Sequence, residues 1–124
     1  MKVFLTGGTG FIGKHVVKIL LNEGHKILLL KRPSNLKYSY LDRVQVTSGD
    51  LSTIQDCKKK IKDFEPDSAI HLAWEGIPDY SAETSTKNLK NTAIKNKIIK
   101  LGIRPCNKKN TIVFFKKYVN TFVN

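Results

Sequence analysis

Four glycines fall within eight residues, TGGTGFIG (Thr6–Gly13), directly behind the apolar run that begins the chain. The run itself, Lys2–Thr6 (KVFLT), predicts a short buried strand, because it is apolar, rich in β-forming residues and stopped by glycine. The residues that follow, Phe11–Glu23, predict an amphipathic helix that ends at Gly24. Its apolar positions at helical spacing are Ile12, Val16, Ile19 and Leu20. The chain must therefore turn from a strand into a helix within the glycine-rich stretch.

A turn of this kind suits the binding of phosphate by the main chain. Glycine has no Cβ, so it accepts a positive φ and lets a ligand approach the backbone closely. The first turn of the outgoing helix presents unpaired N–H groups and the positive end of the helix dipole. Gly7, Gly10 and Gly13 are therefore predicted to form a pyrophosphate cradle, although their spacing departs by one residue from the G-x-G-x-x-G fingerprint. The alternative is a glycine-rich turn without a ligand.

The residues behind this unit continue to alternate between strand patterns and helix patterns. The expected strands are His25–Lys31, Arg43–Ser48 and Ser68–Trp74, and the expected helices are Thr53–Phe64 and Ala82–Leu101. A polar loop, Pro33–Tyr40, separates the second strand from the third. The order predicts an α/β fold, with a doubly wound parallel sheet, right-handed crossovers and helices on both faces.

The helix expected over Thr53–Phe64 has the clearest apolar face of the chain. Ser52 or Thr53 is predicted to cap its N-terminus, and Glu65–Asp67 (EPD) is predicted to end it. The apolar positions that define the face are Ile54, Cys57, Ile61 and Phe64.

The net charge of +12 belongs to the C-terminal part of the chain. Residues 1–83 hold twelve basic and all ten acidic side chains, whereas residues 84–124 hold ten basic side chains and no acid. Nucleic-acid binding through this tail is a minor candidate function, since its lysines are interleaved with the aromatic residues Phe114, Phe115, Tyr118 and Phe122. The body of the chain carries no comparable basic patch, so nucleic acid is not the expected partner.

Apolar runs and cysteines argue against a membrane or metal partner. Apolar runs reach about four residues, as in Ile27–Leu30, which is too short for a signal peptide or a bilayer span. Cys57 and Cys106 form no C-x-x-C pair and no ligand pattern with histidine, so both are expected to be reduced thiols. We therefore expect a cytoplasmic protein.

The stretch TGGTGFIG resembles the cofactor loop of the extended short-chain dehydrogenase/reductase family, which contains the NAD-dependent epimerases and dehydratases of nucleotide sugars. The resemblance covers residues 1–92 and implies a Rossmann-type sheet, here incomplete at four to five strands. It implies that NADP or NAD binds at Gly7, Gly10, Phe11, Ile12 and Gly13. The stretch HLAWEGIPDY (residues 71–80) is similar to sugar epimerases of surface-polysaccharide pathways.

Two residues after the third strand match the family at the adenine end of the cofactor. Asp50 and Leu51 follow that strand directly, where the family uses a carboxylate to bind the adenine amino group. Asp50 is therefore assigned to cofactor binding by resemblance. The alternative is that it caps the helix that starts near Ser52, and one carboxylate can do both.

Residues after the fourth strand match the family on the nicotinamide side. The segment His71–Trp74 (HLAW) resembles the H-L-A-A segment beside the cofactor, which assigns Leu72 and Ala73 to cofactor binding. His71 is expected to be a packed strand-end residue rather than a catalyst, since it stands alone without a metal partner. Asn88 resembles an asparagine on the following helix, in a segment N-x-x-G-T where this chain has Asn91 in place of glycine. A surface position for Asn88 is the alternative.

The end of the second strand bears on the choice between NADP and NAD. A carboxylate about 20 residues beyond the glycines would bind the ribose 2′-hydroxyl of NAD. This chain has Lys31 and Arg32 there, and no acid until Asp42. Since basic side chains attract a 2′-phosphate, we expect NADP to be favoured over NAD. The alternative is that both side chains are merely solvated.

The catalytic pair of the family is missing from the sequence. By resemblance, a tyrosine acts as the base, a lysine four residues later lowers its pKa, and the nicotinamide takes and returns a hydride. The fourth residue after each tyrosine is not lysine; the tyrosines are Tyr38, Tyr40, Tyr80 and Tyr118. A nucleotide sugar is therefore expected as a partner only if the substrate-binding half is supplied.

The segment 93–124 departs from the family pattern. A fifth strand is expected at Ile112–Phe115 (IVFF). Lys116 and Lys117 follow it, where the family has a serine-rich turn. We expect a truncated or frameshifted product whose frame is lost near Thr92 or soon after. Such a half would expose a sheet edge and an apolar face, so self-association is also expected.

Two functions from different classes follow from these observations. The first is the cofactor-binding N-terminal portion of a sugar-nucleotide epimerase or dehydratase that is catalytically incomplete as written. The second is a stand-alone dinucleotide-binding module, either a cofactor sensor or one subunit of a split enzyme. The missing tyrosine–lysine pair fits both.

Overall fold

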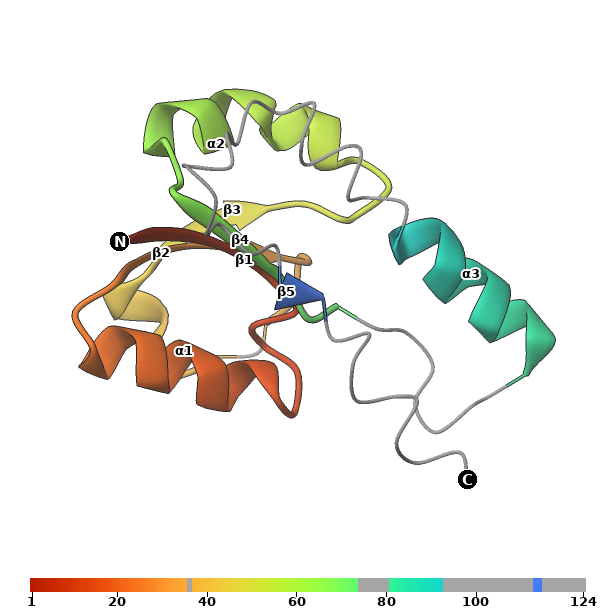
Figure 1. The fold of residues 1–124 in the computed structure, drawn as a ribbon, viewed down its shortest axis with the longest axis horizontal. Helices are drawn as coiled ribbons and strands as arrows, with labels where there is room; N and C mark the ends of the chain where they lie inside the picture. Colours follow the sequence, from red (N-terminus) through yellow and green to blue (C-terminus); the bar gives the residue numbers. More distant parts are fainter. Residues whose placement is uncertain (36, 74–80, 93–112, 115–124) are drawn as a thin grey trace.

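A computed structural model describes residues 1–35, 37–73, 81–92 and 113–114 (Figure 1). Its elements, in chain order, are β1 (Lys2–Thr6), α1 (Gly13–Asn22), β2 (Lys26–Lys31), the 3₁₀ turn η1 (Leu41–Arg43), β3 (Gln45–Ser48), the 3₁₀ turn η2 (Ile54–Cys57), α2 (Lys58–Phe64), β4 (Ser68–His71), α3 (Ala82–Thr92) and β5 (Val113–Phe114). The strands form a parallel sheet in the order β3-β2-β1-β4-β5, with α1 on one face and α2 on the other (Figure 1). The predicted α/β fold with a doubly wound parallel sheet is confirmed.

The central strand β1 fixes where the carboxyl ends of the strands meet. Leu5 of β1 is in register with Leu29 of β2 on one side and with Ile70 of β4 on the other. One residue further along, Thr6 is in register with His71. Because the strands are parallel, the loops that follow β1, β2, β3 and β4 all leave from the same edge of the sheet.

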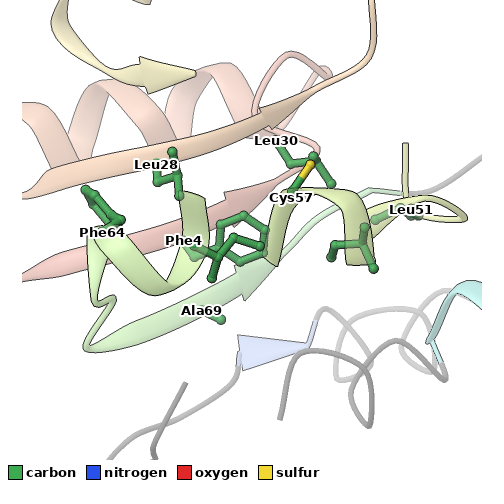
Figure 2. Close-up of a cluster of buried hydrophobic side chains, with 9 residues drawn as sticks. Phe4, Leu28, Leu30, Leu51, Cys57, Phe64 and Ala69 are labelled. Carbon is green, nitrogen blue, oxygen red and sulfur yellow. The ribbon is translucent and has the colours of Figure 1, made fainter. Parts of the chain in front are cut away.

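The helix η2–α2 covers one face of the sheet with the apolar face that the sequence predicts. Ile54 and Ile61 are fully buried, and Cys57 and Phe64 are nearly so. They pack on strand residues of the same face, Phe4, Leu28, Leu30 and Ala69, together with Leu51 (Figure 2). We call these nine residues the α2-face cluster. Its continuity across three strands explains why the helix lies flat on the sheet.

The opposite face is covered by α1, whose buried side differs from the prediction. Val17 is fully buried, whereas Ile12 is 43% exposed and Ile19 is 56% exposed. The cluster on this side, the α1-face cluster, consists of Leu5, Val17, Ile27, Leu29 and Tyr40, with Leu20 and Leu21 packed against it. The prediction that Ile12 and Ile19 form the buried face is therefore wrong. The helix is rotated because Gly13 and Val17, one turn apart, are the positions that approach the sheet.

Several element boundaries differ from the sequence prediction. Helix α1 begins at Gly13 rather than at Phe11, and Gly24 follows its end with φ 77° as predicted. The single helix expected over residues 53–64 consists of the 3₁₀ turn η2 and then α2. It ends at Glu65, which takes φ 50° in the left-handed region directly before Pro66. The break predicted at Glu65–Asp67 is confirmed.

The N-cap predicted at Ser52 or Thr53 is not formed by either side chain. Thr53 is the residue before η2, but it makes no side-chain cap hydrogen bond. Instead, the Asp50 carboxylate accepts hydrogen bonds from the Ser52 backbone N–H at 2.9 Å and from the Ser52 hydroxyl at 3.0 Å. These bonds close an Asx turn that precedes η2, so they are not an N-cap of the helix.

The remaining strand and helix predictions are confirmed within the described ranges. Strands β2 and β3 begin one and two residues later than expected. Strand β4 ends at His71, and Trp74 and residues 93–101 lie outside the described residues. Val113–Phe114 pairs with β4 in parallel, within the stretch expected as the fifth strand. The loop Pro33–Tyr40 is not uniformly polar, since Tyr40 is buried in the α1-face cluster.

The described residues contain no helix that is long and apolar enough to cross a membrane. Within the same residues, no group of three or more His, Cys, Asp or Glu side chains is arranged to hold a metal ion. Cys57 is a free, buried thiol in the α2-face cluster, and Cys106 lies outside the described residues.

Candidate functional site

The glycine turn lies between the carboxyl end of β1 and the start of α1. Gly7 takes φ 75°, which turns the chain out of the strand. The Gly10 N–H then donates to the Gly7 carbonyl oxygen at 3.0 Å, and the Lys14 N–H donates to the Gly10 carbonyl oxygen at 3.1 Å. The turn therefore runs directly into the helix, and the first N–H groups of α1 lie beside it.

Gly7 and Gly13 are required by the packing of the protein itself. A Cβ on Gly7 would lie 2.4 Å from the backbone nitrogen of Ala73 and 2.4 Å from the carbonyl carbon of Leu72. A Cβ on Gly13 would lie 2.0 Å from the Gly7 oxygen and 2.6 Å from the Gly8 Cα. These neighbours are main-chain atoms and cannot rotate away, so both positions must be glycine whether or not a ligand binds.

Gly10 differs from the other glycines of the turn. A Cβ there would meet one atom within 4 Å, the Gly7 oxygen at 3.3 Å, and its φ is not positive. By contrast, a Cβ on Gly8 would lie 2.5 Å from the Leu29 side chain and 2.9 Å from the Leu5 side chain. The protein's own packing and backbone therefore explain glycine at positions 7, 8 and 13, whereas Gly10 has one tight contact and no severe clash.

Phe11 and Ile12 lie between the turn and the first residue of α1. Phe11 is 81% exposed, with the Lys14 ammonium 5.3 Å from its ring centroid and the His15 ring edge-on at 6.2 Å. Ile12 occupies the N-cap position without a side-chain cap, so the first N–H groups of α1 receive no side-chain acceptor from it. Of the predicted cofactor residues, Gly10, Phe11 and Ile12 are thus exposed at the turn, whereas Gly13 is buried. Lys14 adds a basic side chain at the helix N-terminus.

Thr6 and His71 join the carboxyl ends of β1 and β4 beneath the turn. The Thr6 hydroxyl and His71 Nδ1 are hydrogen-bonded at 2.5 Å, and both residues are buried. Burial lowers the pKa of His71, so its imidazole is neutral at pH 7. The prediction that His71 is a packed strand-end residue agrees with this position.

Leu72 and Ala73 lie against the glycine turn. The Leu72 N–H donates to the Thr6 carbonyl oxygen at 3.0 Å, which extends the pairing of β1 and β4 by one bond. Both residues are half-buried, and their main chain forms the wall behind Gly7. The structure thus brings these two predicted residues together with the turn.

Asp50 and Leu51 follow β3 at the same edge of the sheet. The Asp50 carboxylate accepts from the Ser52 N–H, and this bond is the main reason that the pKa of Asp50 lies below its ordinary value; the charge of Arg32 contributes in the same direction. Leu51 is buried in the α2-face cluster. Asp50 therefore closes a turn ahead of η2 rather than capping that helix, and its assignment to cofactor binding stays a prediction.

Lys31 and Arg32 end β2 at this edge. The Lys31 ammonium donates to the Ser34 carbonyl oxygen at 2.9 Å and to the Ser34 hydroxyl at 3.0 Å. Arg32 is exposed and close enough to Asp50 for its charge to act on that carboxylate. Asn88 lies on α3, and its side chain is outside the described residues.

Sequence reasoning missed two residues that shape the site. The sequence pattern predicts only a strand position for Thr6 and only a polar-loop position for Tyr40. Tyr40 donates a hydrogen bond from its hydroxyl to the Gly8 carbonyl oxygen at 2.9 Å. No periodic pattern surrounds Tyr40, and the one available signal was an aromatic pair, Tyr38 and Tyr40, in an otherwise polar stretch.

A family model described as "NAD dependent epimerase/dehydratase family" matches residues 3–115 of the chain. Among curated proteins, the chain is 29% identical over 105 residues to dTDP-6-deoxy-L-talose 4-dehydrogenase (NAD(+)) of Aggregatibacter actinomycetemcomitans, covering 84% of this chain and 39% of that protein. It is 32% identical over 80 residues to a UDP-glucose 4-epimerase of Neisseria meningitidis, covering 58% of this chain and 24% of that protein.

Solved structures show the same fold. A UDP-glucose 4-epimerase of Thermotoga maritima, crystallised with UDP-glucose, aligns with TM-score 0.65 and 25% identity over 83% of this chain and 35% of that chain. The Bordetella bronchiseptica enzyme WbmG, in complex with NAD and UDP, aligns with TM-score 0.61 and 22% identity over 82% of this chain and 34% of that chain. The chain spans less than two fifths of the length of each of these relatives.

Proposed function

Since the chain belongs to the NAD dependent epimerase/dehydratase family, we propose that it is the NAD(P)-binding N-terminal portion of a sugar-nucleotide epimerase or dehydratase. For these 124 residues the proposed activity is binding of the dinucleotide at the glycine turn. The chemistry on the sugar is proposed only for a longer protein that contains such a portion, because the relatives are more than twice as long as the part that this chain matches.

One observation carries the proposal: Gly10 is the glycine of the turn that the protein's own packing does not require. Gly7 and Gly13 would clash with main-chain atoms if they carried a Cβ, whereas Gly10 would meet a single atom at 3.3 Å. The contact at 3.3 Å is to the Gly7 carbonyl oxygen and is tight, but it is much longer than the contacts at Gly7 and Gly13. A residue without a side chain at the N-terminus of a ten-residue helix is what close approach of a phosphate to the backbone needs.

The residues around the turn fit a dinucleotide. The N–H groups at the start of α1 and the positive end of its dipole favour the pyrophosphate, and Lys14 adds a charge beside them. Asp50 lies at the same edge of the sheet and would accept a hydrogen bond from the adenine amino group. Once bound, the nicotinamide would supply hydride transfer to and from a sugar carbon.

We further propose that NADP is preferred over NAD. Lys31 and Arg32 lie at the end of β2, where the 2′ position of the adenosine ribose is expected, and no acidic residue lies between Arg32 and Asp42. The named cofactor of the Aggregatibacter relative is NAD(+), so this preference depends on the two basic side chains alone. The guanidinium of Arg32 is exposed, so its N–H groups could donate charge-assisted hydrogen bonds to a 2′-phosphate.

The preference is tested by comparing dissociation constants for NADPH and NADH. Arg32→Asp should shift the ratio toward NADH by about tenfold or more, because one charged hydrogen bond is lost and a repulsive carboxylate is gained. Lys37→Asp makes the same charge change at an exposed position in the same loop, and should shift the ratio by far less. Equal constants for the two cofactors in the unmodified chain would refute the preference.

Binding itself is tested by titrating the 124-residue chain with NADH and NADPH and following cofactor fluorescence. Gly10→Ala should weaken binding at least about tenfold, since the methyl group would occupy the space in front of the turn. Gly24→Ala is the matched control. It adds a methyl group at φ 77° with no atom within 4 Å, at the far end of α1, so it strains the backbone but leaves the turn intact. Equal binding by the Gly10 variant and the unmodified chain would contradict the proposal.

A stand-alone dinucleotide-binding module is the second candidate. The observation in its favour is that none of the four tyrosines in the sequence is followed by lysine four residues later. Sequencing the adjoining gene separates the candidates. A downstream frame that encodes Y-x-x-x-K and a sugar-binding domain supports the epimerase or dehydratase, and its absence supports the module.

A further inference from the structure

Tyr40 links the loop after β2 to the main chain of the glycine turn. Its side chain is 5% exposed and packs in the α1-face cluster. Its ring stacks on Tyr38, with centroids 5.4 Å apart and an interplanar angle of 27°. Its hydroxyl donates to the Gly8 carbonyl oxygen at 2.9 Å. The ring is therefore held by packing while the hydroxyl reaches the turn.

The Gly8 carbonyl is a point at which the turn needs an external constraint. Gly7 and Gly8 both lack a Cβ, so their own φ and ψ preferences do little to fix the peptide planes that lead to Thr9. In a planar trans peptide, the carbonyl and the following N–H point in opposite directions. Holding the Gly8 oxygen on the side of Tyr40 therefore directs the Thr9 N–H away from the α1-face cluster.

Few other bonds restrain this part of the turn. In the ranges that the structure describes, Tyr40 contributes the one side-chain hydrogen bond to the main chain of residues 7–13. The turn is otherwise closed by main-chain bonds, from Gly10 to Gly7 and from Lys14 to Gly10. Neither of them involves the peptide between Gly8 and Thr9.

Burial favours the donor form of Tyr40. Desolvation raises the pKa of the Tyr40 hydroxyl above its ordinary value, and the neighbouring Tyr38 adds to the effect. The hydroxyl is therefore protonated throughout the neutral range. A buried donor and a buried acceptor that satisfy each other are costly to separate.

We propose that Tyr40 is a positioning residue for the dinucleotide: its hydroxyl holds the Gly8–Thr9 peptide in the orientation in which the glycine turn binds pyrophosphate. This inference rests on the proposed cofactor binding. The same loop begins at Lys31 and Arg32, which are proposed to face the 2′ position. One loop would thus meet the adenosine half of the ligand at its start and orient the pyrophosphate site at its end.

The test is a set of NADH and NADPH titrations of the full chain with three variants. Tyr40→Phe removes the hydroxyl and keeps the ring. Tyr38→Phe removes the neighbouring hydroxyl, which makes no hydrogen bond to the turn. Ile61→Val deletes one methylene from a fully buried position in the α2-face cluster, so it lowers stability without touching the turn. Urea unfolding sets conditions in which each variant is fully folded.

We expect Tyr40→Phe to weaken binding about threefold to tenfold, the loss that follows from one net hydrogen bond. Tyr38→Phe and Ile61→Val should leave the dissociation constants unchanged. A merely structural role would predict that Tyr40→Phe and Ile61→Val behave alike at matched stability. Unchanged binding in Tyr40→Phe, while the unmodified chain binds, overturns this inference alone. Absence of saturable binding by the folded, unmodified chain overturns the proposed function and this inference with it.

A rescue variant and an exchange measurement complete the test. Tyr40→4-aminophenylalanine restores an N–H donor at the same place, so it should recover most of the lost affinity. In Tyr40→Phe, amide hydrogen exchange should accelerate at Gly10, whose N–H is bonded to the Gly7 oxygen, while β2 keeps its protection, because local opening is specific to the turn. If Tyr40→Phe instead accelerated exchange equally in the turn and in the sheet, relative to the unmodified chain, the loss would be global. That result would contradict the assignment of Tyr40 as a positioning residue of the turn.

Discussion

Gly13→Ala adds a single methyl group at the point where α1 leaves the glycine turn. The new Cβ would lie 2.0 Å from the Gly7 carbonyl oxygen and 2.6 Å from the Gly8 Cα. Both are main-chain atoms, and Gly7 is itself held against the backbone of Leu72 and Ala73. The methyl group can therefore be accommodated only if α1 moves away from the turn or if the turn moves away from β4.

The cost follows from what must move. Overpacking of a tightly packed site destabilises proteins by about 1–3 kcal/mol, and a neighbour that cannot rotate places this site near the upper end. The gain in helix propensity on replacing glycine by alanine offsets at most about 1 kcal/mol. We therefore expect Gly13→Ala to lower the free energy of unfolding by about 2 kcal/mol. For a domain of this size that corresponds to a fall in Tm of roughly 10 °C.

Gly10→Ala is the matched comparison, since its Cβ meets one atom at 3.3 Å and its φ is not positive. Its free energy of unfolding should change by no more than about 0.5 kcal/mol. Urea and thermal unfolding, followed by circular dichroism, measure both values. If the two variants were equally stable, or if Gly10→Ala were the less stable one, the assignment of Gly13 to packing and of Gly10 to the ligand would be refuted.

Three further outcomes are expected. Thr6→Val should cost about 1–3 kcal/mol in urea unfolding, because the buried hydrogen bond between the Thr6 hydroxyl and His71 Nδ1 is lost. Burial lowers the pKa of His71 below the ordinary value of 6.5, so near and below that pH the unfolded chain binds more protons than the folded chain. The free energy of unfolding should therefore fall as the pH drops from 7.5 to 5, and His71→Gln should make this fall smaller. Asp50→Ala should cost about 1 kcal/mol at pH 7 through loss of the Ser52 bond, whereas Asp50→Asn, which keeps an acceptor, should cost less; equal losses would contradict this assignment.

The sheet and one helix could be predicted because their signals are local. The run KVFLT is β1 at the predicted residues, Lys2–Thr6, since four consecutive apolar or β-forming residues before glycine leave few alternatives. The face of Ile54, Cys57, Ile61 and Phe64 is buried as predicted, although its first turn is 3₁₀. The spacing of apolar residues predicts such a buried face whether the residues form a 3₁₀ turn or an α-helix.

The rotation of α1 could not be predicted from the same kind of pattern. Its sequence offers apolar residues on more than one side, so both Val17 and Ile19 fit a helical stripe. The close contact of Gly13 with Gly7 determines which side of α1 faces the sheet. It places Val17 against the sheet and leaves Ile19 exposed. That contact joins residues whose proximity depends on the geometry of the whole turn.

The sequence by itself determined the order of strands and helices, the glycine turn between β1 and α1, and the basic residues at the end of β2, because each depends on neighbours along the chain. Only the tertiary structure decided which glycines are packed against main-chain atoms. It alone placed the Tyr40 hydroxyl on the Gly8 carbonyl, 32 residues away in sequence. Contacts of this range depend on how the parallel strands bring their carboxyl ends to one edge, and no local pattern encodes them.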